Sequence, residues 1–323
     1  MAMKFAAAIA LLGAGLIAPA TLAQTFPSRP INVIVGTAPG DPGDIVARLV
    51  QNRLAERLGQ PWVVETRAGA SAKIASQAVA RAAPDGHTLL VTLSAHVINP
   101  ASASVLPYDT IHDFAGVSLL ARQPLIVAVH PSVKGANLTE FIAAAKANPG
   151  GKLAYSSPGA GSLSFLVGEQ IARRGGIEMA HAPFRGGSPA VQALLTNEVQ
   201  LSALIGAILL PHIRVGTLRA IAVTSATRIA ELPDVPTLAE LGFESAAIYN
   251  WIGVFAPAAT PAAVVNRLNA ELNAALREPA IAARLGEASL EIVASTPAEL
   301  DAFVAAEIAR WRKFTRDYNI RFE

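Results

Sequence analysis

Residues 31–50, INVIVGTAPGDPGDIVARLV, decide the fold of this 323-residue chain. The run from Ile31 to Val35 is mostly β-branched and apolar, which predicts a buried strand. A loop of glycine, proline and small residues follows, and Asp44 is then expected to cap a helix that ends at Gly59. The inner face of this helix is expected to carry Ile45, Leu49, Val50, Leu54 and Leu58. A strand, a loop and an amphipathic helix in succession are the repeating unit of a parallel α/β sheet.

The same unit recurs along the chain in two sets. Further strands are expected at 62–65, 89–92, 153–155, 179–182, 199–205 and 219–224, and further helices at 74–82, 138–147 and 163–174. The apolar stretch 201–210 is expected to be a buried strand and a following turn, and Pro189 to stand first in a helix. Thr260 and Thr296 are expected to cap two C-terminal helices, and Glu299 to complete a capping box with Thr296.

Two extended stretches, near 117–128 and 246–256, connect the two sets. The predicted fold class is therefore α/β, with two doubly wound α/β domains joined by two crossover strands and a ligand cleft between them. Domain 1 is predicted to be discontinuous, at 25–120 plus 250–323, and domain 2 to span 121–249. Ligands of open α/β sheets bind beyond the carboxyl ends of the strands, which points to the loops at those ends.

The first 23 residues have the pattern of a secretion signal. Lys4 precedes an apolar run from Phe5 to Ala18, and small residues up to Ala23 suit a signal peptidase. The run has 14 residues, whereas a membrane span needs about 20. The chain contains no cysteine, so it cannot carry the acylated cysteine of a lipoprotein. We expect a signal peptide at 1–23 that is cleaved, and an exported product without a lipid anchor.

Composition and motifs point away from nucleic acid and from recognisable catalysis. The formal charge is +2, and no block of like charge predicts a nucleic-acid surface. The chain contains no G-x-S-x-G, H-E-x-x-H or P-loop motif, its six histidines are scattered, and a thiolate nucleophile is impossible without cysteine. We therefore predict no catalytic residue, no metal site and no cofactor. An exported hydrolase stays open as the alternative to a binding protein.

Three loops of small residues precede helices, at 38–43, 157–162 and 185–188. A helix N-terminus presents unpaired amides and a positive dipole end, and glycine lets an anion approach them. Small residues are also common before helices for conformational reasons alone, so a single loop is weak evidence. Together with two further strand ends, these loops supply the candidate ligand-binding residues Ala38, Pro39, Gly40, Asp41, Ser94, Ser157, Gly159, Ala160, Gly161, Ser162, Gly186 and Ile205.

Short motifs along nearly the whole chain carry a family resemblance. They include Pro39-Gly-x-x-x-Asp44, Ala83-Pro-Asp-Gly86, Pro107-Tyr-Asp109, Ser157-x-Gly-x-Gly-Ser162 and Leu232-Pro-Asp-Val-Pro-Thr237. On these motifs the chain resembles the periplasmic solute-binding receptors of tripartite tricarboxylate transporters, the Bug-type family. The resemblance implies a hinged, periplasmic-binding-protein-like monomer that delivers a small organic acid to the membrane permease subunits. It also implies that the first loop and the Gly-x-Gly-Ser loop grip a ligand carboxylate through amides, hydroxyls and water. A sensor that reports ligand to a signalling partner is the other use of such a fold.

Three departures from the family pattern bear on the ligand. Asp41 stands where the family usually has glycine, and two like charges ~4 Å apart cost about 4 kcal/mol at an effective dielectric of 20. Asp41 therefore points away, is neutralised, with Lys73 as the candidate partner, or faces a ligand that carries an amine. Phe165 replaces a common histidine, and Ile205 lies where an acid is frequent. This drier pocket suits an aromatic or aliphatic acid, or an amide, better than citrate.

Overall fold

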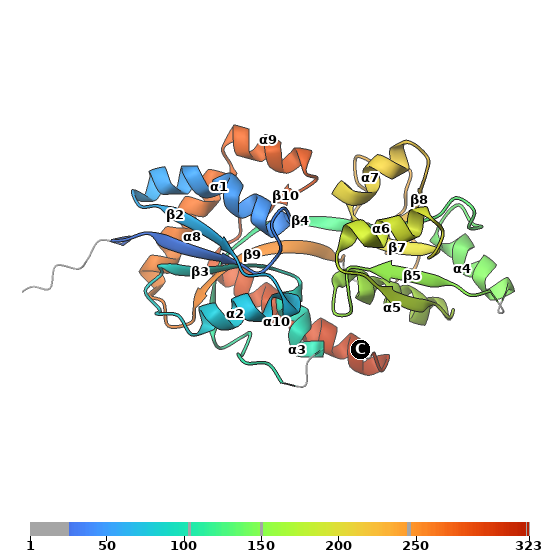
Figure 1. The fold of residues 1–323 in the computed structure, drawn as a ribbon, viewed down its shortest axis with the longest axis horizontal. Helices are drawn as coiled ribbons and strands as arrows, with labels where there is room; N and C mark the ends of the chain where they lie inside the picture. The colour runs from blue at the N-terminus through green and yellow to red at the C-terminus, as the bar shows by residue number, and fades with distance from the viewer. Residues whose placement is uncertain (1–25, 103–104, 149–150, 244–246, 321, 323) are drawn as a thin grey trace, which may run out of the picture.

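The computed structural model describes residues 26–102, 105–148, 151–243, 247–320 and 322. The predicted signal segment, residues 1–23, lies outside this part of the chain. The described residues form two lobes that lie side by side and are connected by two long strands (Figure 1). Within the described ranges, no helix is both long enough and apolar enough to cross a membrane.

The first lobe contains three parallel strands, with the first between the other two: β1 (Ile31–Val35), β2 (Trp62–Thr66) and β3 (Thr88–Leu93). Its helices and one short strand come from both ends of the chain: α1 (Pro42–Leu58), η1 (Ala70–Ala72), α2 (Lys73–Ala80), α3 (Ala95–Ser102), α8 (Ala262–Leu276), α9 (Pro279–Glu287), β10 (Glu291–Ile292) and α10 (Pro297–Asp317).

The second lobe repeats the arrangement with the middle third of the chain. It consists of α4 (Leu138–Ala147), β5 (Ala154–Ser157), α5 (Leu163–Gly175), β6 (Ala180–Pro183), α6 (Gly187–Leu195), β7 (Leu201–Ile205), α7 (Gly206–Arg214) and β8 (Arg219–Val223). Strand β5 lies between β6 and β7 and is parallel to both, so the loops that follow β5, β6 and β7 emerge at one edge.

Two antiparallel strands, β4 (Phe114–Val129) and β9 (Tyr249–Pro257), connect the lobes. The sheet runs β2-β1-β3-β9-β4-β7-β5-β6, and β4 belongs to both lobes. Its first half pairs with β9 and β10, and its second half pairs with β7 and β8. Two α/β lobes joined by two crossing strands confirm the predicted fold class. The domain division at 25–120 plus 250–323 and 121–249 stays a prediction, and β4 changes partners between Pro124 and Leu125, a few residues after the predicted boundary.

Helices cover both faces of the sheet, as a doubly wound arrangement requires. On one face, α1, α8 and α9 bury a core with β1 and β3, while α6 and α7 cover the second lobe. On the other face a single apolar cluster extends under both lobes, from Val79 and Trp311 to Phe141 and Leu166. The lobes therefore share a hydrophobic core along that face.

Thr224 ties the two crossing strands at the point where the chain passes between the lobes. The Leu125 amide of β4 donates to Thr224 Oγ1 at 2.8 Å, and this hydroxyl donates to the Ile248 carbonyl at 2.5 Å. The backbone of Thr224 bonds to the same two residues, at 3.0 and 2.8 Å. Thr224 is buried. One hydroxyl thus holds together the two segments that connect the lobes.

The first helix begins earlier than predicted. It starts at Pro42 with Asp41 at the N-cap position, so Asp44 lies in the first turn and is not the cap. The prediction that Ile45 faces the core is also wrong, because its side chain is 43% exposed while Val46 and Ala47 are buried. The buried residues follow one i, i+3, i+4 stripe from Val46, and Ile45 falls off that stripe.

Other helix ends correct the sequence predictions in the same way. Pro189 is the third residue of α6, still within the first turn, where a missing N–H costs no hydrogen bond. Pro261, not Thr260, is the N-cap of α8. Where a turn was expected after β7, the structure has helix α7, which continues through Pro211 and buries Leu209 and Leu210. The capping box of Thr296 and Glu299 on α10 is confirmed.

Candidate ligand-binding site

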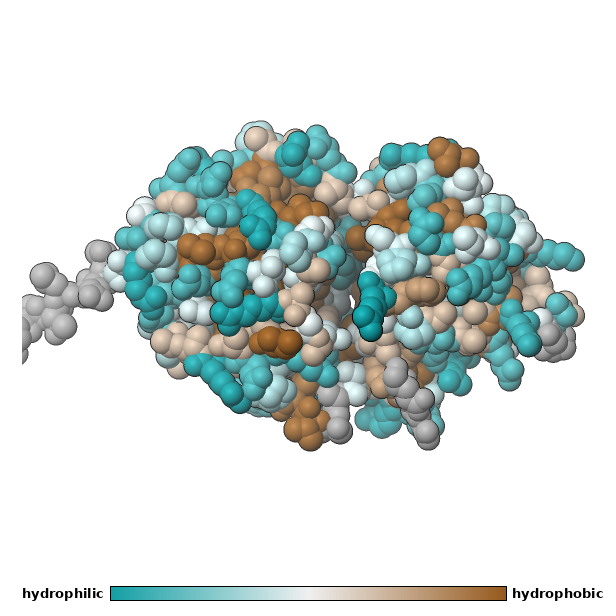
Figure 2. All heavy atoms as spheres, in the orientation of Figure 1, coloured by the Kyte–Doolittle hydropathy of each residue, from teal (hydrophilic) through white to brown (hydrophobic). Residues whose placement is uncertain are grey.

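The predicted site residues lie where strands end and helices begin. Residues 38–41 connect β1 to α1, Ser94 follows β3, 157–162 connect β5 to α5, Gly186 precedes α6, and Ile205 ends β7. In Figure 1 the start of α1 and the loops of the second lobe face the gap between the lobes, and Figure 2 shows a cleft there. The topology therefore gathers the candidate residues at the two facing edges.

In the first loop, the amides that were expected to bind a ligand already have acceptors. The Ala38 amide donates to Asp41 Oδ2 at 3.1 Å, and the Gly40 amide donates to Asp44 Oδ2 at 2.9 Å. Asp44 is buried and also accepts from Arg48 Nε at 2.8 Å. Pro39 and Gly40 are exposed, and Gly40 has a φ of 83°, a conformation that favours glycine. The loop's own carboxylates hold its shape.

Asp41 and Lys73 form no ion pair: within the described residues, no nitrogen–oxygen contact of 4.0 Å or less joins the two side chains. Desolvation raises the pKa of the Asp41 carboxyl, the Ala38 amide opposes that shift, and the neighbouring Asp44 charge adds to it. The neutralising partner that the sequence suggested is therefore not in place. Without Lys73 as a partner, three alternatives for Asp41 stay open: it points away from the ligand, it is neutralised in another way, or it faces a ligand that carries an amine.

In the second loop, Ser162 is the N-cap of α5. Its Oγ accepts from the Phe165 amide at 3.2 Å, which leaves its O–H proton to donate. Gly159 and Gly161 have φ values of 132° and 83°, so both positions favour glycine. Ala160 between them is half-buried. Glycine flexibility, a capping hydroxyl and first-turn amides make this loop a donor set for an anion.

The Ser157 hydroxyl forms hydrogen bonds within this loop and so helps to fix its conformation. It donates to the Gly159 carbonyl and accepts from the Gly159 amide, each at 3.1 Å. It also lies 2.7 Å from His181 Nε2 on β6, and Ser157 is fully buried. The sequence prediction that Ser157 belongs to the site is refined: its hydroxyl is used by the protein itself.

His181 is a residue whose role the sequence did not reveal. Its half-buried ring stacks on Tyr155 at 5.0 Å and meets Phe165 at 4.7 Å. Burial lowers the pKa of His181, while the nearby Glu169 charge opposes that shift. The contact with Ser157 arises because Tyr155 and His181 pair across β5 and β6. No spacing in the sequence signals that register.

The Ser157–His181 pair has the separation of a nucleophile and its base, so it tests the hydrolase alternative. The geometry does not suit attack on a substrate, because Ser157 has no exposed surface and its hydroxyl is engaged by Gly159. Among the residues that the structure describes, no group of three His, Asp or Glu side chains could hold a metal ion. The contact between Ser157 and His181 therefore stabilises the conformation of the loop between β5 and α5.

Ser94, Gly186 and Ile205 lie at the same edges but have different surroundings. The Ser94 side chain is buried and donates to Asn250 Oδ1 of β9 at 3.1 Å, so it fastens β3 to the crossing strand. Gly186 is the N-cap of α6 with a φ of 118°, and Ile205 is the half-buried N-cap of α7. Gly159 and Phe184 approach one another, which brings the α5 and α6 loops together.

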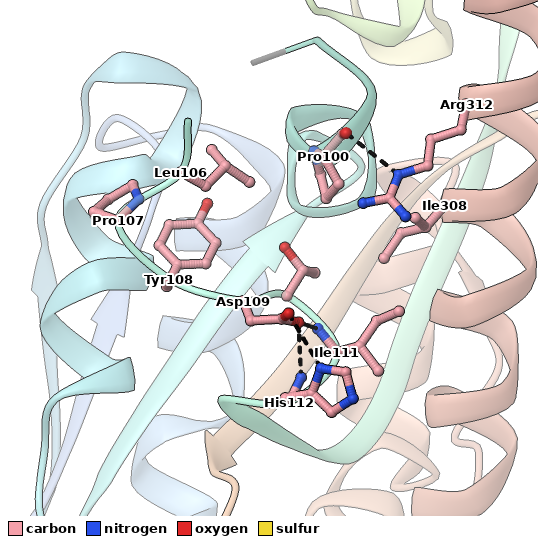
Figure 3. Close-up of a pocket in the computed structure, with 10 residues that line it drawn as sticks. Pro100, Leu106, Pro107, Tyr108, Asp109, Ile111, His112, Ile308 and Arg312 are labelled. Carbon is pink, nitrogen blue, oxygen red and sulfur yellow. Dashed lines mark hydrogen bonds and ion pairs between the residues drawn. The ribbon is translucent and has the colours of Figure 1, made fainter. Parts of the chain in front are cut away.

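The structure has two cavities that the candidate residues do not line, although Gly206 of the second cavity directly follows Ile205. The first, about 660 Å³, is on the face of the first lobe that carries α3 and α10 (Figure 3). Arg312 reaches the Pro100 carbonyl on one side of it, and Asp109 pairs with His112 on the other. The second, about 400 Å³, lies between the lobes beside the crossing strands. None of the predicted site residues lines either cavity.

The lobes also meet at the end of α10. This helix packs on α3 and β4 of the first lobe, and Phe322 beyond its end lies against Phe165 of the second lobe, with ring centroids 5.4 Å apart. Gly161 lies beside Phe322 as well. The last described residue of the chain therefore touches the loop that contains Ser162.

Comparisons with known proteins agree on one family. A family model described as "tripartite tricarboxylate transporter family receptor" matches residues 46–320. BugT of Bordetella pertussis is 36% identical over 306 residues, which cover 94% of this chain and 93% of that protein. A solved R. palustris protein with adipate is 31% identical with a TM-score of 0.81, covering 92% of this chain and 99% of that one. MatC from Rhodopseudomonas palustris with bound malate is 32% identical with a TM-score of 0.78, covering 90% and 99%.

These relatives are solute-binding receptors and not enzymes, which decides against the exported hydrolase. The receptors of this family are periplasmic, bind small carboxylates and work with the permeases of tripartite transporters. The resemblance inferred from the motifs is thus confirmed over most of the chain. The protein belongs to the receptor family of the tripartite tricarboxylate transporters.

Proposed function

We propose that this chain is an exported receptor that captures a small organic acid between its lobes and delivers it to a tripartite tricarboxylate-type permease. The observation that carries the proposal is the donor set at the start of α5, where Ser162 and two glycines precede a helix N-terminus at the cleft. Similar proteins solved with adipate and malate support a carboxylate as the ligand.

The remaining parts of the proposal follow from the family and the sequence. Residues 1–23 are removed on export, and the mature receptor acts in the periplasm as a monomer. One ligand carboxylate binds the amides of Ala160 and Gly161 and the Ser162 hydroxyl, because the amides of Gly159 and Ser162 already donate within the loop. The ligand's other end meets the first loop across the cleft. Closure about the crossing strands then encloses the ligand.

Native mass spectrometry of protein purified from the periplasm, followed by a thermal-shift panel of carboxylates, amino acids and amides, tests the proposal. A true ligand at 100 times its dissociation constant should add about 2.7 kcal/mol to the free energy of unfolding. A panel in which esters and amides are turned over, and none of the acids stabilises the protein, would contradict a receptor function.

Ser162→Ala is expected to weaken binding of the acid found in that panel by about 1 kcal/mol or more, because a donor to the carboxylate is lost. Isothermal titration calorimetry measures the change. The substitution also removes a helix cap, so Thr296→Ala, which removes the cap of α10, is the matched control. The control should lose stability and keep its affinity. Equal affinity in both variants would move the carboxylate away from the start of α5.

A further inference from the structure

The two lobes present opposite hydrogen-bonding character to the cleft. At the start of α1, Asp41 and Asp44 accept the amides of Ala38 and Gly40. The Asp44 charge is compensated by Arg48, whereas Asp41 has no cationic partner within 4.0 Å among the described residues. Asp41 is exposed at the start of α1, which lies beside the gap between the lobes (Figure 1), so its carboxylate is accessible to a hydrogen-bond donor there.

The corresponding loop of the second lobe carries no acid. Residues 157–165 read SPGAGSLSF, so the start of α5 presents amides and the Ser162 hydroxyl without any negative side chain. A carboxylate is favoured at such a helix start because of the unpaired amides and the dipole. At the start of α1, in contrast, a ligand carboxylate would have to displace Asp41 from the Ala38 amide and lie beside its charge.

We infer that the receptor selects ligands with a single carboxylate, bound at the start of α5, and with an amine or amide at the other end that donates to Asp41. This inference rests on the proposed function and narrows its ligand class. The raised pKa of Asp41, caused first by desolvation and further by Asp44, agrees with a carboxylate that lacks a compensating charge. The ammonium or amide N–H of the ligand donates a hydrogen bond to the Asp41 carboxylate.

Matched probes of equal length test the inference by calorimetry. The first set is succinate, succinamate and 4-aminobutyrate, and the second is adipate, adipamate and 6-aminohexanoate. Each set changes only the end that faces Asp41. The proteins are the wild type, Asp41→Gly, Asp41→Asn and Glu56→Gln. The last removes an exposed charge from the opposite end of the same helix, about 20 Å away at 1.5 Å per residue, and serves as the control.

We expect the wild type to bind the monoamide or the amine of at least one set at least tenfold more tightly than the matching dicarboxylate. Asp41→Gly and Asp41→Asn should each tighten dicarboxylate binding about tenfold or more, and Glu56→Gln should not. The gain should shrink in 1 M salt, because the repulsion between charges near the surface is screened. A merely structural role of Asp41 would not give that salt dependence.

One outcome contradicts only the inference about Asp41, and the other contradicts the proposed function as well. Dicarboxylate binding that is equal to monoamide binding in the wild type, or unchanged in both Asp41 variants, overturns the inference and leaves the receptor function intact. If none of the six probes, and no acid of the wider panel, binds any of the four proteins, the proposed capture of small acids is wrong, and the inference is wrong with it.

Discussion

The free energy of unfolding is expected to fall by about 5 kcal/mol between pH 6.5 and pH 3 because of His96 alone. His96 of α3 has no exposed surface, and neither ring nitrogen has a hydrogen-bond partner among the residues that the structure describes. Phe114 and Phe255 lie 4.9 and 4.7 Å from its ring, and burial lowers its pKa from 6.5 to about 3. Between pH 6.5 and pH 3, His96 is protonated in the unfolded chain and neutral in the folded protein. The free energy of unfolding therefore decreases as the pH falls through this window, by about 1.4 kcal/mol per pH unit.

Urea unfolding at several pH values measures this slope. His96→Phe and the smaller His96→Leu remove the titrating group and should flatten the profile relative to the wild type. Phe114→Leu is the control, because it weakens the same aromatic cluster without removing a titrating group. It should lower stability by a similar amount at every pH. A wild-type slope that persists in both His96 variants would show that another group is responsible.

Thr224→Val is expected to destabilise the protein by about 2–5 kcal/mol although the side chains have nearly the same shape. Valine has no hydroxyl, so the buried Leu125 amide loses its acceptor and the Ile248 carbonyl loses its donor. Each unsatisfied buried group costs about 1–3 kcal/mol. Thermal and urea unfolding measure the loss.

Thr224→Ser separates the hydroxyl from the methyl group. Serine keeps both hydrogen bonds and loses one buried methyl, so it should cost only about 1 kcal/mol. Equal losses in the valine and serine variants would mean that packing, and not the hydroxyl, holds Leu125 and Ile248 together.

Local patterns predicted most of the elements and the loops from which the candidate site is drawn. Alternating strands and amphipathic helices, the Ser162 loop and the capping box of Thr296 depend on residues close together in the sequence, and short-range geometry fixes them. The parallel order of the strands then placed the loops at facing edges. Helix starts were missed by one to three residues where proline or aspartate suits several positions of the first turn, as at Pro42 and Pro189.

Contacts that depend on strand pairing could not be predicted. His181 meets Ser157 only because β5 and β6 pair in one register, and a shift of one residue would turn the ring to the other face. Ser94 bonds to Asn250, 156 residues away, once β3 lies beside β9. The candidate Asp41–Lys73 pair is not formed, and the Asp41 carboxylate accepts a hydrogen bond from an amide three residues away.

The contact of Phe322 with Phe165 has a practical consequence for anyone who produces this receptor. An affinity tag fused directly after Phe322 would begin beside the α5 loop, where it adds bulk against the part of the cleft that is proposed to hold the carboxylate. Such fusions are expected to alter the measured ligand affinity. A cleavable tag on the amino-terminal side of β1 avoids this, because β1 enters the first lobe from the side opposite the cleft (Figure 1).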